Sequence, residues 1–174
     1  MDTRLLTKIA LCIALNCVAA YISFPLPFTP GLVTALTLTL SLTAFILPPK
    51  ETFIVVATYI LLGAIGVPVF AGGQGLARLL SPVGGFYFAW AVAFPLLSLA
   101  KGSVPNFKRY VLADVLIAVP ITYVGGLLSM MFVGEVELTQ ALMMAVVPFI
   151  PGDLMKACAA AWLGVKLQLG MRNA

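Results

Sequence analysis

Long apolar segments constrain what this chain can fold into more than any other feature of its sequence. A helix needs about 20 consecutive apolar residues, within a range of about 17–25, to cross a lipid bilayer. Six segments of about this length follow one another with short polar breaks: residues 5–23, 31–47, 52–70, 83–100, 109–133 and 151–169. We therefore expect an all-α membrane protein with six transmembrane helices, in which residues 1–174 form a single six-span domain.

Charged residues are too few for a water-soluble domain. They make up 9% of the chain, whereas a soluble domain carries about 25%. A further apolar stretch, residues 138–150, is too short to cross the bilayer, and Pro148 and Pro151 separate it from the last long segment. We expect this stretch to form an interfacial or re-entrant helix that packs over the bundle.

The positions of the basic residues predict how the bundle is oriented. If the six segments cross in turn, eight basic residues fall on one side: Arg4, Lys8, Lys50, Lys101, Lys108, Arg109, Lys166 and Arg172. Arg78 is the only basic residue in the loops on the opposite side, and Lys156 lies inside the last segment. Because cytoplasmic loops are enriched in Lys and Arg, we expect both termini to be cytoplasmic. Residues 24–30, 68–82 and 134–150 should then face outward.

Several kinds of function are excluded by what the chain lacks. It contains no histidine, so it has no His-based catalytic triad and no HExxH metal site. It has no P-loop motif for ATP hydrolysis. Cys12, Cys17 and Cys158 lie in apolar segments without paired spacing, which argues against disulfides or a zinc site. The scattered basic residues give no sign of nucleic-acid binding. We expect no catalytic residues, no metal and no cofactor.

A glycine-rich stretch, GAIGVPVFAGGQGLARLLSPVGGFYFAW (residues 63–90), lies on the predicted outer side. It has seven glycines and two prolines. Irregular backbone at membrane depth is tolerated where it is buried in protein or lines a cavity, and glycines let a ligand approach the main chain. The stretch predicts either a ligand site, with Gly73, Gln74, Arg78 and Tyr87 as candidate contacts, or a tight loop with close helix packing.

Two opposite charges, Asp153 and Lys156, stand at the start of the last apolar segment. The three-residue spacing places them on one face of a helix. Ionisable groups inside membrane spans usually face an interior cavity, pair with each other and mark a site. The alternative is a mutually neutralising structural pair, and the two interpretations are compatible if a ligand inserts between the charges.

Together these two features predict an outward pocket with a carboxylate, an ammonium, a guanidinium, an amide and aromatic surfaces. Such a pocket suits a small ligand with one acidic end and one amide-like end. Asp114 is the other charge inside an apolar segment, and we expect it to be an interfacial partner of Lys108 or Arg109.

Three motifs, LLGAIGVPVFAGGQG, SPVGGFY and VPFIPGDLMKA, resemble the signature regions of the BioY family, the biotin-binding S components of energy-coupling factor (ECF) transporters. The resemblance runs over nearly the whole chain. It implies a six-helix S component in a bacterial or archaeal cell (inner) membrane that captures biotin on the outside. A separate transmembrane coupling subunit and two ATPase subunits would drive its release inward.

The resemblance also implies roles for particular residues. The family's acid and lysine correspond to Asp153 and Lys156, and the polar residue of its glycine-rich loop corresponds to Gln74. Asp153 would accept the ureido N–H groups of biotin, and Gln74 or main-chain amides would serve the ureido oxygen. Lys156, with Arg78, would meet the valerate carboxylate, or Lys156 would instead orient Asp153. An Ala-x-x-x-Ala pattern on the first helix, Ala10 and Ala14, would dock the coupling subunit.

Three other functions remain open from the sequence. The chain could be an S component for another vitamin or vitamin precursor. It could be an intramembrane enzyme with a Ser81–Lys156 dyad, although it has little other catalytic chemistry to offer. It could also be a structural membrane subunit without a ligand.

Overall fold

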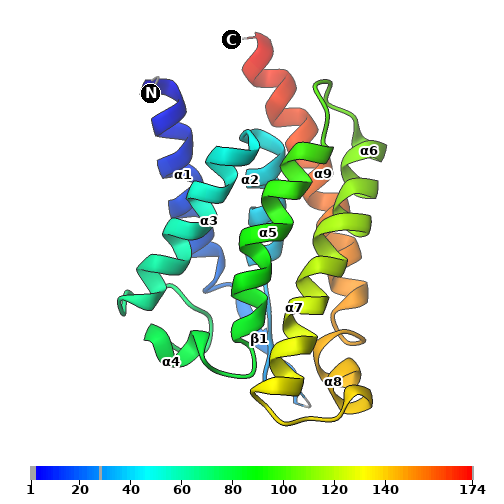
Figure 1. Cartoon of the computed structure of the whole chain (residues 1–174). Coiled ribbons are helices and arrows are strands. Elements are labelled where there is room, and N and C mark those ends of the chain that lie inside the picture. The colour runs from blue at the N-terminus through cyan, green and yellow to red at the C-terminus, as the bar shows by residue number, and fades with distance from the viewer. Residues whose placement is uncertain (1–2, 28, 174) are drawn as a thin grey trace.

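The computed structural model describes residues 3–27 and 29–173, which form a mostly helical bundle (Figure 1). Its elements are α1 (Thr3–Ala19), β1 (Ser23–Pro25), β2 (Leu32–Thr34), α2 (Leu36–Ile46), α3 (Pro49–Ala64), α4 (Gly75–Leu79), α5 (Gly84–Ala100), α6 (Phe107–Ala113), the π-helical segment η1 (Asp114–Ala118), α7 (Val119–Phe132), α8 (Leu138–Ala145) and α9 (Ile150–Asn173). Both ends of the chain lie at one end of the bundle, here called the termini end. The hairpin, α4 and α8 lie at the opposite end, called the loop end.

Each of the six predicted segments contains a helix, and the short stretch before the last segment forms α8. α6, η1 and α7 form one helix, Phe107–Phe132, of 26 residues, which is long and apolar enough to cross a membrane. Among the described residues a second span is counted only if α8 and α9, bent by 43°, are taken together. The number of crossings therefore stays a prediction, while the helical character of the chain is confirmed.

A short β-hairpin departs from the all-α prediction. β1 and β2 pair antiparallel, with Ser23 opposite Thr34 and Pro25 opposite Leu32. Prolines at positions 25, 27 and 30 prevent the helix from continuing because proline lacks an N–H and clashes with the preceding turn. Pairing of the two strands instead provides hydrogen-bond partners for the N–H and C=O groups of the extended backbone. The prediction was wrong at this point, and the first two helices are correspondingly shorter than predicted.

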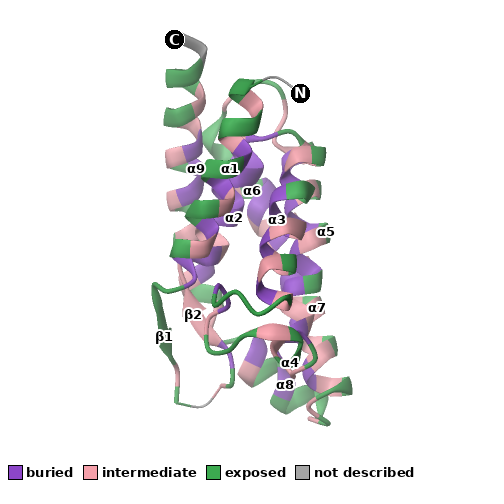
Figure 2. Ribbon diagram, turned by 90° about the vertical axis from the view of Figure 1, so that its left-hand side faces the viewer, coloured by how far each residue is buried: buried purple, intermediate pink, exposed green. Residues whose placement is uncertain are grey.

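α2 is the central helix of the bundle. It packs against α1, α3, α5 and α9, and eight of its residues are buried: Leu36, Thr39, Leu40, Ser41, Leu42, Thr43, Ala44 and Phe45. Figure 2 shows buried residues gathered between the helices, while exposed ones lie on outward faces. Because α2 directly follows β2, its first turn, with Leu36 and Thr37, lies at the side of α2 that faces the loop end.

α5 and α7 cross with their backbones in close contact. A Cβ atom added to Gly85 would overlap the carbonyl oxygen of Gly125, and one added to Gly125 would overlap Ala89. Gly85 and Ala89, like Gly125 and Ser129, are small residues four positions apart, the spacing that lets membrane helices approach closely. This crossing holds the aromatic face of α5 against the polar start of α7.

The buried end of α2 is capped by two side chains from the end of α5. Lys101 Nζ donates hydrogen bonds to the carbonyl oxygen of Ala44, at 2.8 Å, and to that of Leu47. Ser98 Oγ also donates to the Leu47 oxygen, at 2.6 Å. A cation at a helix C-terminus complements the carbonyl groups that have no partner within the helix. Lys101 is therefore a structural cap as well as one of the basic residues of the termini end.

We expect Lys101→Met to lower the free energy of unfolding by about 2 kcal/mol. The Ala44 carbonyl oxygen would lose its side-chain donor, and the Leu47 oxygen would keep the hydrogen bond from Ser98 but lose the one from Lys101. Burial lowers the pKa of Lys101 to about 8, against the opposing effect of Glu51. The unfolded chain then binds more protons than the folded one between about pH 8 and the usual lysine value, so the native chain gains stability as pH rises through this window. Lys101→Met should lack that gain.

Thermal unfolding in detergent at neutral and alkaline pH measures both effects of Lys101. Lys50→Met is the matched control, since Lys50 is exposed in the first turn of α3, and α3 begins at the same end of the bundle. Equal thermal midpoints for the two variants at neutral pH would contradict the capping role.

Asp114 does not form the predicted ion pair with Lys108 or Arg109 among the described residues. It is 2% exposed and sits inside the bundle, in η1, where it lines a small cavity with Ser41. Arg109 Nε instead donates to the carbonyl oxygen of Ala100, at 2.9 Å. The prediction was wrong because residues five or six positions apart on a helix do not share a face, unlike those three or four apart.

Candidate ligand-binding site

A cavity opens at the loop end between the hairpin, α2, α4, α5, α7 and α9. Its empty volume, including open space at its mouth, is about 610 Å³. Its wall is mainly apolar and aromatic, with polar side chains from most of these elements: Thr34, Thr37, Arg78, Tyr87, Trp90, Thr122, Tyr123, Asp153 and Lys156. An apolar cavity with a few convergent polar groups is the usual form of a ligand pocket.

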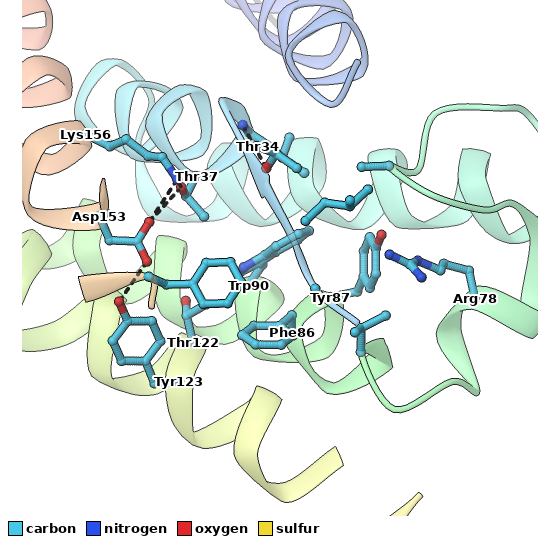
Figure 3. A pocket seen from close by; sticks show the side chains of 16 residues that line it. Thr34, Thr37, Arg78, Phe86, Tyr87, Trp90, Thr122, Tyr123, Asp153 and Lys156 are labelled. Atoms are coloured by element: carbon cyan, nitrogen blue, oxygen red, sulfur yellow. Dashed lines mark hydrogen bonds and ion pairs between the residues drawn. The ribbon is translucent and has the colours of Figure 1, made fainter. Parts of the chain in front are cut away.

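Asp153 forms the centre of one end of this cavity (Figure 3). Lys156 Nζ lies 3.0 Å from Asp153 Oδ1, and both side chains are largely buried. Tyr123 donates its hydroxyl to Asp153 Oδ2, at 2.8 Å. Lys156 also donates to Thr37 Oγ1, at 3.3 Å, which in turn lies 3.4 Å from Asp153 Oδ1. Residues from α2, α7 and α9 thus hold the carboxylate in one orientation.

This arrangement leaves Asp153 able to accept hydrogen bonds from a ligand. The residue lies in the first turn of α9, where the helix dipole favours a negative charge. A carboxylate offers about four lone-pair sites, so its two oxygens can accept further hydrogen bonds beside those from Lys156 and Tyr123. The structure confirms that Asp153 and Lys156 are paired.

Arg78 lies at the other end of the cavity, beyond Tyr87, toward whose hydroxyl its guanidinium points (Figure 3). Within the described residues no carboxylate is close enough to form an ion pair with it, and its buried Nε has no hydrogen-bond partner there. Cβ atoms added to Gly72 and Gly73 would each lie 3.2 Å from the Arg78 side chain. The glycines therefore leave the room in which Arg78 reaches the cavity.

An aromatic array forms one wall between these two ends. The rings of Phe70 and Tyr87 have centroids 4.5 Å apart, and those of Tyr87 and Trp90 are 4.8 Å apart. Tyr59 stands behind them, 5.7 Å from Phe70, and donates its hydroxyl to the carbonyl oxygen of Val69, at 2.9 Å. The array presents a rigid apolar surface and ties the loop after α3 to the bundle.

The structure brings four of the predicted site residues to one cavity: Arg78, Tyr87, Asp153 and Lys156. Gln74 and Gly73 are described but are not among its lining residues. Gln74 is exposed and precedes α4 without a capping hydrogen bond from its side chain. Close helix packing, one interpretation of the glycine-rich stretch, is seen at Gly85, while Gly73 makes room for Arg78, which lines the cavity. The ligand-site interpretation stays a prediction.

Thr37, Thr122 and Tyr123 were missed from the sequence. They carry no charge and lie within long apolar segments, so they do not stand out by composition. A usable signal was present in TALTLTLSLT, where hydroxyl residues recur along a helix that is otherwise entirely apolar. Ala10 and Ala14, the predicted docking residues, are both exposed on α1.

Comparisons with known proteins give consistent matches. The model of the BioY family matches residues 1–173. The biotin transporter BioY2 of Lactococcus lactis subsp. cremoris is 34% identical over 168 residues, covering 93% of this chain and 88% of that protein. The biotin transporter BioY of Thermotoga maritima is 34% identical over 166 residues, covering 95% and 96%. The probable biotin transporter BioY of Pyrococcus horikoshii is 33% identical over 172 residues, covering 97% and 98%.

Two solved structures share the fold. The S component for biotin from an ECF-type ABC transporter superposes with a TM-score of 0.87 at 24% identity, covering 97% of this chain and 94% of that chain. The S component of a bacterial ECF transporter gives a TM-score of 0.60 at 19% identity, covering 99% and 98%. The fold is that of an ECF S component, and the sequence matches extend over almost the whole chain. The chain belongs to the BioY family.

Proposed function

We propose that this chain binds biotin in the cavity at the loop end and serves as the substrate-binding subunit for biotin uptake. The arrangement of charges in the cavity carries the proposal. The ion pair of Asp153 and Lys156 lies at one end, and Arg78, which has no carboxylate partner among the described residues, lies at the other. Relatives named biotin transporters support the choice of ligand.

The two ends of biotin match the two ends of the cavity. Its ureido ring has two N–H donors and a carbonyl acceptor, and its valerate chain ends in a carboxylate. Asp153 accepts a hydrogen bond from a ureido N–H group, and Lys156, already engaged with Asp153, orients that carboxylate. Arg78 receives the valerate carboxylate, since a guanidinium binds carboxylates in bidentate fashion. The exposed position of Gln74 favours Lys156 over Gln74 as a donor to the ureido oxygen.

We further propose six crossings of a bacterial or archaeal cell (inner) membrane, with cytoplasmic termini and an outward loop end. Both termini lie at the same end of the bundle (Figure 1). The loops predicted to face outward lie at the end where the cavity opens. Arg78 is the only basic residue in these loops. The bilayer would contact the exposed apolar faces of the helices.

A transmembrane coupling subunit and two ATPase subunits would complete the transporter, as in other ECF systems. The exposed positions of Ala10 and Ala14 on α1 support their role in docking the coupling subunit, because small residues four apart let another helix approach closely. On this proposal the chain itself catalyses no reaction.

The test is calorimetric titration of the purified chain in detergent with biotin and with a panel of other vitamins and precursors. We expect saturable binding of one biotin per chain and no comparable binding of the others. Tighter binding of another vitamin would show that this vitamin, and not biotin, is the ligand. The absence of any ligand-dependent heat or thermal stabilisation would indicate a structural subunit without a ligand.

Arg78→Met should weaken biotin binding by about 10- to 100-fold, because a charge-assisted hydrogen bond of about 1.5–3 kcal/mol is lost. Biotin amide, which lacks the carboxylate charge, should lose much less affinity. Lys108→Met is the control, because Lys108 is exposed in the first turn of α6, and α6 lies at the termini end. Equal losses for biotin and its amide would show that Arg78 does not meet the carboxylate.

A further inference from the structure

Trp90 carries a buried hydrogen-bond donor without a partner. Its side chain lines the cavity from α5 and the residue is only 7% exposed. The indole Nε1 has no hydrogen-bond partner among the residues that the structure describes. Buried donors of this kind are nearly always satisfied in folded proteins, and Trp90 stands where a ligand would lie.

The orientation of the indole shows which part of a ligand it would meet. In Figure 3 the nitrogen edge of Trp90 points toward the end of the cavity that holds Thr37 and Asp153, away from Arg78. The ring is kept in place by Tyr87, whose centroid is 4.8 Å away. The donor of Trp90 and the acceptor of Asp153 therefore face the same end of the cavity.

We propose that Trp90 Nε1–H donates a hydrogen bond to the ureido carbonyl oxygen of bound biotin. The inference rests on the proposed function and names a ligand contact beyond the Asp153–Lys156 pair. One edge of a cyclic urea presents an N–H donor and the carbonyl acceptor side by side. A carboxylate and an indole N–H at the same end of the cavity are complementary to that edge, and the carbonyl oxygen has two lone pairs to share between Trp90 and Lys156.

Trp90→Phe removes the donor and keeps an aromatic ring against Tyr87. We expect biotin affinity to fall about 10-fold, the usual effect of one hydrogen bond to a buried partner. The same fold-loss should occur with desthiobiotin, which lacks the thioether sulfur, and with biotin amide, which lacks the carboxylate charge. A loss that disappears with either analogue would assign the N–H to the sulfur or to the carboxylate and overturn the proposal.

Nuclear magnetic resonance of the indole groups tests the contact without altering Trp90. The chain contains two tryptophans, so Trp162→Phe leaves a single indole signal, and Trp162 is exposed on α9. Saturating biotin should move the Trp90 indole proton downfield and slow its exchange with solvent. An unmoved signal under conditions where calorimetry records bound biotin overturns this inference alone, whereas absence of biotin binding to the unaltered chain overturns the proposed function.

Discussion

Asp153→Asn is expected to weaken biotin binding by about 100-fold or more. The substitution replaces the carboxylate that accepts a ureido N–H group by an amide, one of whose two polar atoms is a donor. It also leaves Lys156 without its counter-ion in a largely buried position, where breaking a pair is strongly unfavourable. Losing two charge-assisted hydrogen bonds amounts to about 3 kcal/mol or more, which is at least about 100-fold in affinity.

Two variants make the result specific. Tyr123→Phe removes one hydrogen bond to Asp153 and keeps its charge, so its loss should be about 10-fold at most. Asp114→Asn changes the other buried aspartate, which does not line the main cavity, and should leave affinity nearly unchanged. Calorimetry on the purified variants, each checked for a single peak in size exclusion, gives the comparison.

Lys156→Ala separates the two roles that the sequence left open for this lysine. If Lys156 orients Asp153, biotin and biotin amide should lose affinity to the same large extent. If it meets the valerate carboxylate, biotin should lose far more than the amide. Unchanged biotin affinity in both Asp153→Asn and Lys156→Ala would show that this end of the cavity does not contact biotin.

The charged part of the site could be predicted from the sequence because charges are conspicuous in an apolar chain. Asp153, Lys156 and Arg78 stand out individually, and their common cavity follows once the outward loops are placed together. Thr37 and Tyr123, which hold Asp153, were missed because hydroxyl groups are common in membrane helices and only tertiary contacts show which ones face a site. Gln74 was predicted from its position in a motif, but its side chain is exposed.

The length of the apolar runs predicted where the helices lie, but it carries no information on which helix face is buried. The apolar runs could not reveal the hairpin after α1, because a proline-containing extended segment is also apolar there. Asp114 was misplaced for a similar reason. Its distance from Arg109 along the chain suggested a neighbour, whereas the helical rotation directs it into the bundle.

The α5–α7 crossing makes the second large prediction: Gly85→Ala should sharply reduce the yield and thermal stability of the folded chain. The single added methyl group would overlap the carbonyl oxygen of Gly125. Backbone cannot move aside as a flexible side chain can, so the two helices must separate. Overpacking of this kind costs about 1–3 kcal/mol and more where backbone is involved. Trp90 and Tyr123 lie on these two helices, so biotin affinity should fall as well.

Gly170→Ala provides the matched control for this crossing. Gly170 also lies in a helix, α9, but a Cβ atom added there would meet nothing within 4 Å. Since alanine is favoured over glycine in a helix by about 1 kcal/mol, Gly170→Ala should be neutral or slightly stabilising. Replacing glycine by alanine is thus expected to lower the thermal stability at position 85 and to keep or raise it at position 170. Thermal midpoints measured with and without biotin test both expectations. Equal midpoints for the two variants would mean that α5 and α7 do not depend on contact between their backbones.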